Sequence, residues 1–378
     1  MARPFAVCAL ASLAVNAADL GLRGLATTWE TDDDNSILQL VALPPLYSPP
    51  GTKVAVVGPY LWYDSPENSQ LELLPCSMAY GAAAAPGGGP AFFFATGNAL
   101  GPVAIYTVDA VSGALLRNVS LAATGPLALT AMAFNAASGE LDALAYAGAP
   151  GAAVPQAVAV DPASGAVRVL AAALQLPDFQ GPCEASVAPH AVAASHLYFV
   201  QQDAVGWQRG NETYLMAMNM SSGAARRLVA RSPRDGMLSN VAAVDASAPG
   251  GAELVLYTTN AWDQDLNETA ELTIWALDPA AVDAQPAAVA TVLNPQQGDG
   301  PLLPTWGTLS VDGAGAQRTV SMLATNNIGR IFTYIIVLNV SVAADGVVTP
   351  TGAPAFTQID DSDVTGGMIY RMNRVVTQ

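Results

Sequence analysis

The sequence has little charge, and positive charge is especially scarce. Only 12% of the 378 residues are charged, Lys53 is the single lysine, and the formal net charge is −17. Such a chain has no cationic stripe that could replace the counterions of phosphate groups, which excludes nucleic acid and anionic lipid as partners. Hydrophobic residues make up 52% of the chain, so a disordered protein is excluded and a large core is expected.

Long apolar runs are also missing. No run after the first residues reaches the roughly 18 residues of a transmembrane helix, so we expect no transmembrane segment. The start of the chain differs, because Arg3 precedes a short apolar segment from Pro4 to Val15 and small residues end at Ala17. This pattern predicts a signal peptide at residues 1–17 and a secreted, extracellular protein, with a buried N-terminal helix as the alternative.

Cysteine is rare, and only Cys76 and Cys183 would remain after cleavage of the leader. In an oxidising compartment they could form a disulfide, but a bridge needs Cα atoms within about 7 Å, so the sequence leaves this pairing open. Five glycosylation sequons fit the same compartment. We expect glycans on the outer parts of the repeats, at Asn118, Asn211, Asn219, Asn267 and Asn339.

One hairpin motif recurs along the chain. It reads TVDAVSGALL around Gly113, AVDPASGAVR around Gly165 and AMNMSSGAAR around Gly223, at intervals of 52 and 58 residues. An Asp or Asn side chain at the start of such a loop can bond to the following backbone, and the glycine supplies the positive φ. Each copy therefore predicts a tight turn between two apolar strands.

Two more strand-like segments precede each hairpin, and no segment has helical periodicity. Four strands in about 55–60 residues, repeated, predict an all-β fold, a single β-propeller of four-stranded antiparallel blades at residues 18–378. Five repeats occupy about 76–353, and strands from both termini, about 35–58 plus 355–377, would close the ring. We expect six blades, with seven as the alternative. A string of immunoglobulin-like sandwiches fits less well.

The hairpin motif, apolar-x-Asp-x-x-Ser-Gly, resembles that of the β-propeller superfamily, including quinoprotein-like and surface-layer propellers. The quinone-binding members carry a Trp shortly after the glycine, and none follows Gly113, Gly165 or Gly223. We therefore predict no cofactor, and the sequence leaves open only Ca²⁺.

Polar residues recur where the second strand of a repeat is expected to end. Their oxygens could ring one face of the propeller and hold a hard cation, or they could simply cap the loop backbone. The candidate cation ligands are Asn98, Asp203, Asn260 and Asn326, with Glu184. A partial calcium-loop pattern, without its closing Glu, adds Asp361, Asp363 and Thr365. Further candidates for the ligand face are Asn327, Trp207, Trp262, Asp263 and Asp265.

Nucleophilic catalysis has little support, because the chain has no Gly-x-Ser-x-Gly motif and only two histidines. We therefore favour a binding or scaffold module for an extracellular protein or carbohydrate over an enzyme. The alternative is a Ca²⁺-dependent hydrolase of the lactonase kind, a class of propellers that the sequence loosely resembles. That hydrolase would use the ring of candidate cation ligands.

Overall fold

The computed structural model consists of β-strands joined by turns. It describes residues 21–29, 36–63, 73–96, 103–123, 127–147, 154–172, 174, 187–193, 196–202, 212–231, 236–245, 253–260, 271–281, 285–295, 302–305, 307–313, 315–326, 332–361 and 369–375. Across these residues, no helix is long and apolar enough to cross a membrane. The predicted signal peptide and its cleavage point lie outside the described residues.

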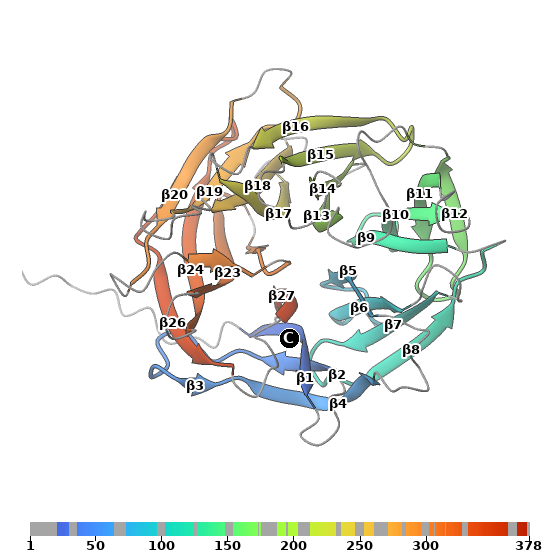
Figure 1. The fold of residues 1–378 in the computed structure, drawn as a ribbon, viewed down its shortest axis with the longest axis horizontal. Coiled ribbons are helices and arrows are strands. Elements are labelled where there is room, and N and C mark those ends of the chain that lie inside the picture. The colour runs from blue at the N-terminus through green and yellow to red at the C-terminus, as the bar shows by residue number, and fades with distance from the viewer. Residues whose placement is uncertain are drawn as a thin grey trace, which may run out of the picture.

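The sheets stand around a common axis, as Figure 1 shows. Five sheets are four-stranded and antiparallel, and a sheet of seven strands fills the remaining sector. From the inner to the outer strand, four of the five blades are β5 (Leu73–Gly81), β6 (Ala91–Thr96), β7 (Ala104–Asp109) and β8 (Leu115–Ser120); β9 (Leu127–Asn135), β10 (Glu140–Ala147), β11 (Val154–Val160) and β12 (Val167–Ala171); β13 (Val187–Ala193), β14 (His196–Gln202), β15 (Thr213–Asn219) and β16 (Ala225–Arg231); and β17 (Met237–Asp245), β18 (Glu253–Asn260), β19 (Leu272–Leu277) and β20 (Ala287–Val292).

Strands from both ends of the chain form the fifth blade, as expected. Its order is β27 (Ile369–Arg374), β1 (Leu22–Trp29), β2 (Ser36–Ala42) and β4 (Ala55–Tyr63). The innermost strand is the last of the chain, and it pairs antiparallel with the first, where Leu22 faces Arg374. This pairing closes the ring.

The seven-stranded sheet differs from a blade at both its inner and its outer edge. The inner position is shared by β21 (Leu302–Pro304) and β22 (Ser310–Asp312), both of which pair with β23 (Gln317–Asn326). On the outer side, β24 (Phe332–Val342) pairs with β25 (Val348–Pro350) and β26 (Ala355–Asp360). The last strand is β3 (Thr52–Lys53), from the N-terminal part of the chain, and it lies parallel to β26.

The predicted count of six or seven blades is wrong, because the structure has five four-stranded blades. The fifth repeat of the sequence was expected to form an ordinary blade, but its strands are interrupted. Pro304 ends β21 because proline has no backbone N–H to donate, and Gly307, at a φ of 77°, redirects the chain before β22. Pairing with β3 could not be foreseen, because two residues carry no periodicity.

The recurrent hairpin forms as predicted. In the turn between β7 and β8, the Asp109 carboxylate accepts hydrogen bonds from the backbone N–H groups of Val111 at 2.9 Å and Ser112 at 2.7 Å. Gly113 then takes a φ of 72°, and its N–H donates to the Asp109 carbonyl. Gly165 and Gly223 adopt the same positive φ in the two later copies.

An apolar layer fills each space between neighbouring sheets. Central strands are almost wholly buried, and β6 is buried at all six positions. The layer between the β17–β20 blade and the seven-stranded sheet contains Leu256, Leu272 and Leu302, among others. Such burial, at roughly 25 cal/mol per Å² of apolar surface, is the main stabilising contribution to the ring.

The glycosylation and disulfide predictions are only partly within view. Asn118 and Asn339 lie exposed on outward-facing positions of β8 and β24, whereas Asn219 is partly buried and its side chain caps a turn. Asn211, Asn267 and Cys183 lie outside the described residues, so modification of these asparagines and a bridge from Cys76 stay predictions.

A pair of glycine substitutions tests how adjacent blades approach each other. A Cβ on Gly113 would collide with the Val57 carbonyl oxygen of the neighbouring blade, whereas a Cβ on Gly139, at nearly the same φ, meets nothing within 4 Å. We expect Gly139→Ala to cost about 1 kcal/mol through backbone strain alone, and Gly113→Ala about 3 kcal/mol. Denaturant unfolding measures both, and equal costs would show that the blades do not meet there.

Candidate functional site

Three of the predicted ligand-face residues lie within the described part of the chain. Asn260 ends β18, Asn326 ends β23, and Asp361 follows β26. The others lie outside the described residues and stay predictions: Asn98, Glu184, Asp203, Trp207, Trp262, Asp263, Asp265, Asn327, Asp363 and Thr365.

Asn260 and Asn326 face the same layer from opposite sheets. In an antiparallel pair, directly opposite residues point to the same side of the sheet. Asn260 is opposite Leu272 and Asn326 is opposite Leu302, and both leucines belong to the apolar layer between the β17–β20 blade and the seven-stranded sheet. The structure therefore brings two of the predicted ring residues to one layer.

A third asparagine, Asn240 on the inner strand β17, joins this layer. It is opposite Thr258, which lies two residues before Asn260 and so shares its side of the sheet. The Asn240 side-chain amide donates to the Thr305 carbonyl at 3.1 Å, in the interruption between β21 and β22. We name Asn240, Asn260 and Asn326 the amide layer. The sequence analysis missed Asn240 because it sits within a strand.

The second polar group lies on three inner strands around the axis. Asn373 on β27 donates to the Ser310 hydroxyl at 3.2 Å, and this hydroxyl donates to the Asp312 carboxylate at 3.1 Å on the same strand, β22. The Tyr80 hydroxyl of β5 donates to the Arg374 carbonyl at 3.0 Å. We name these five residues the axial cluster. All but Ser310 are partly exposed.

Burial controls the ionisation of this cluster. Desolvation raises the pKa of Asp312 to about 6, although the Ser310 hydrogen bond and the positive charge of Arg374 oppose the shift. Burial and the nearby Asp312 charge raise the pKa of Tyr80 to about 12. A carboxyl group with a pKa close to neutral can accept or donate a proton, and the surrounding hydroxyl, amide and guanidinium groups offer both donors and acceptors.

The sequence gave a weak signal for the axial cluster. Arg371 and Arg374 stand in the short apolar strand IYRMNR, and positive charge is rare in this chain. Burial lowers the pKa of Arg371 to about 10. Asp312 had no such signal, because SVDG reads as an ordinary strand end.

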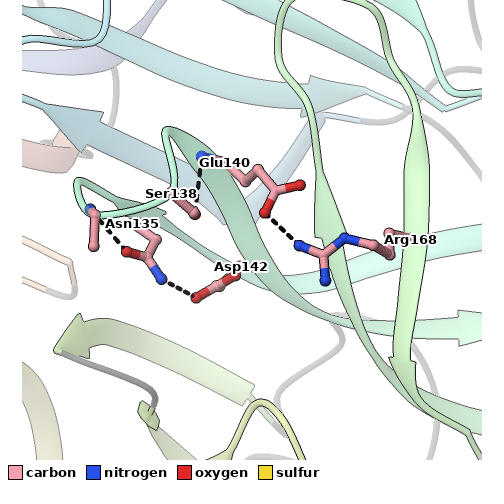
Figure 2. A network of polar contacts seen from close by, with 6 residues as sticks. Asn135, Ser138, Glu140, Asp142 and Arg168 are labelled. Atoms are coloured by element: carbon pink, nitrogen blue, oxygen red, sulfur yellow. Dashed lines mark hydrogen bonds and ion pairs between the residues drawn. The ribbon is translucent and has the colours of Figure 1, made fainter.

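A third polar network, shown in Figure 2, braces a hairpin at the edge of the ring. The Asn135 side chain donates to the Asp142 carboxylate at 2.8 Å across the β9–β10 turn, and Arg168 of β12 pairs with Glu140. Asp142 is 3% exposed, and desolvation raises its pKa. The carboxylate is enclosed and already satisfied by Asn135, so a structural role explains this network.

The partial calcium loop offers one described oxygen ligand. The Asp361 carboxylate accepts a hydrogen bond at 2.6 Å from the Thr333 hydroxyl, which ties the end of β26 to the start of β24. Among the described residues, no three His, Cys, Asp or Glu side chains gather in a way that could hold a metal ion.

No protein-family model matches the chain, and no curated protein matches it. Solved structures share the fold only weakly. Endo-1,4-beta-xylanase from Bacteroides thetaiotaomicron is 12% identical at a TM-score of 0.35, over 77% of this chain and 99% of that one. A hypothetical selenium-binding protein from Sulfolobus tokodaii is 9% identical at a TM-score of 0.40, over 89% and 92%. An alpha-L-arabinanase from Penicillium chrysogenum is 11% identical at a TM-score of 0.36, over 76% and 93%.

Similarity this distant says nothing about activity. The β-propeller part of the resemblance is confirmed by the arrangement of the sheets. The quinoprotein-like or surface-layer type is not, because no family model matches. Function must therefore be argued from the residues themselves.

The pKa of Asp312 makes stability depend on pH. Because this pKa is raised to about 6, the folded state keeps a proton that the unfolded state loses near pH 4. The stabilisation is present below pH 4 and is lost as the pH rises through 6. Asp312→Asn has no proton to lose, so its stability relative to the natural protein should be about 2 kcal/mol greater at pH 8 than at pH 4. Urea unfolding at both values measures this difference, and a constant difference would contradict the buried carboxylate.

Proposed function

We propose that this protein is a secreted binding module that takes a polyhydroxylated ligand, a carbohydrate, at the axial cluster. The observation that carries the proposal is the hydrogen-bonded chain from Asn373 through Ser310 to Asp312, joining inner strands of two sheets. A carboxylate accepts hydrogen bonds from sugar hydroxyls, and amide and guanidinium groups donate to their oxygens. The rigid sheets hold these groups in place before any ligand arrives, which reduces the entropy cost of binding.

Ligand binding tests the role of the carboxylate. On an array of neutral and acidic oligosaccharides at pH 7.5, Asp312→Asn should bind at least about tenfold more weakly than the natural protein, because charge-assisted hydrogen bonds contribute about 1.5–3 kcal/mol. Asp345→Asn is the matched control, since Asp345 is exposed and caps the turn before β25. Unchanged retention of Asp312→Asn, or no retention of the natural protein, would contradict the proposal.

One observation favours catalysis as the second candidate. A carboxyl group with its pKa near 6 is suited to general acid–base chemistry. Among the described residues, however, Asp312 is the one carboxylate of the axial cluster, and hydrolysis at a sugar usually needs two. Release of product from a retained oligosaccharide, abolished in Asp312→Asn, would identify the protein as an enzyme.

Secretion is supported by the leader pattern and by exposed sequons. We propose that Asn118 and Asn339 carry glycans, because both are exposed on the outward edge and away from the axial cluster. In protein secreted from a eukaryotic host, Asn118→Gln and Asn339→Gln should each remove one glycan mass. Peptide mapping that finds both residues unmodified in the natural protein would argue against this compartment.

A further inference from the structure

We infer that a hard cation binds in the amide layer, held by side-chain oxygens of Asn240, Asn260 and Asn326. This site is separate from the axial cluster and does not depend on the proposed carbohydrate binding. It would join the β17–β20 blade to the seven-stranded sheet, because Asn240 and Asn260 belong to the first and Asn326 to the second.

The polar groups of this layer are buried without full compensation. Asn240 and Asn326 are both 0% exposed, and Asn260 is 6% exposed. Among the described residues, Asn326 has no hydrogen-bond partner for either polar atom of its side chain, and Asn240 has none for its Oδ1. An unsatisfied buried polar group costs about 1–3 kcal/mol, so a ligand that satisfies these atoms would be strongly favoured.

Burial also limits the size of that ligand. The polar atoms of Asn326 are shielded from solvent, as is Oδ1 of Asn240, and leucines of the apolar layer lie beside them. A sugar or a peptide would not fit there without separating the sheets. A monatomic ion would fit, because it needs only close oxygen atoms.

The chemistry of the donors selects the kind of ion. Carboxamide oxygens are hard, neutral ligands of the sort that Ca²⁺ accepts, and they suit alkali ions too. Asn240 presents its oxygen away from Thr305, because its nitrogen donates to the Thr305 carbonyl. No carboxylate belongs to the layer, so the affinity should lie in the range of about 10⁻⁴–10⁻³ M. The net charge of −17 would raise the local cation concentration.

Thermal unfolding of the full chain tests the site. Purified protein is stripped with a chelator and titrated with Ca²⁺, Mg²⁺, Na⁺ or K⁺, with tetramethylammonium chloride keeping the ionic strength constant. We expect one of these ions to raise the Tm by about 2 °C at 10 mM. Asn326→Leu should lose this response and should itself have a higher Tm than the stripped natural protein, because it removes unsatisfied polar atoms.

Thr96→Val is the matched control. Thr96 is also 0% exposed at a strand end and lacks a hydrogen-bond partner for its hydroxyl among the described residues, but it lies on β6 in a different blade. This variant should keep the full ion response. An equal response of the natural protein and Asn326→Leu to every ion, or no response of the natural protein, would overturn the inference.

Asn326→Asp covers the case in which the leucine variant fails to fold. A carboxylate of the same shape should destabilise the stripped protein and bind the ion about tenfold more tightly. If added cation fails to restore the Tm of Asn326→Asp, the site is not a cation site.

Discussion

The antiparallel pairing of β1 with β27 is the interaction on which the rest of the structure depends. It joins residues near the two ends of the chain, and through it the blade of the chain ends becomes a neighbour of two other sheets. Each sheet can then bury both faces, because an apolar layer lies on either side of it. Without this pairing, β27 would leave the ring and expose Ile369 and Met372, which are buried against the seven-stranded sheet. The cost of closing so large a loop is modest, since it grows only with the logarithm of its length.

The seven-stranded sheet departs from the repeat, and polar groups concentrate beside it. The interruption between β21 and β22 frees the Thr305 carbonyl for Asn240, and just beyond it Ser310 and Asp312 face β27. Elsewhere, the inner strands of the blades pack into continuous layers of apolar side chains. Local rules of sequence and packing are most often broken where a protein binds or reacts, which is why both proposed sites adjoin this sector.

The sequence predicted what repetition encodes. The hairpins at Gly113, Gly165 and Gly223 could be identified because each needs a capping Asp or Asn and a positive φ. The blade count could not, because the regularity of the fifth repeat hides the break at Pro304 and the pairing of Thr52 with Ile359 depends on distant segments. Of the sites, the strand-end asparagines were visible as a recurrent pattern. The axial cluster was not, because Ser310, Asn373 and Tyr80 meet only when the ring is closed.

The two groups of polar residues differ in a way that assigns them different ligands. The amide layer is neutral and fully enclosed, so its unsatisfied atoms favour a ligand that brings charge and needs little volume. The axial cluster already contains a carboxylate and a guanidinium, and its residues are partly exposed, so it can exchange hydrogen bonds with a larger neutral molecule. The break between β21 and β22 lies between them and takes part in both, through Thr305 on one side and Ser310 on the other. An ion that fixed Asn240 and Asn326 would also hold this segment, and so would make the axial cluster more rigid for its ligand.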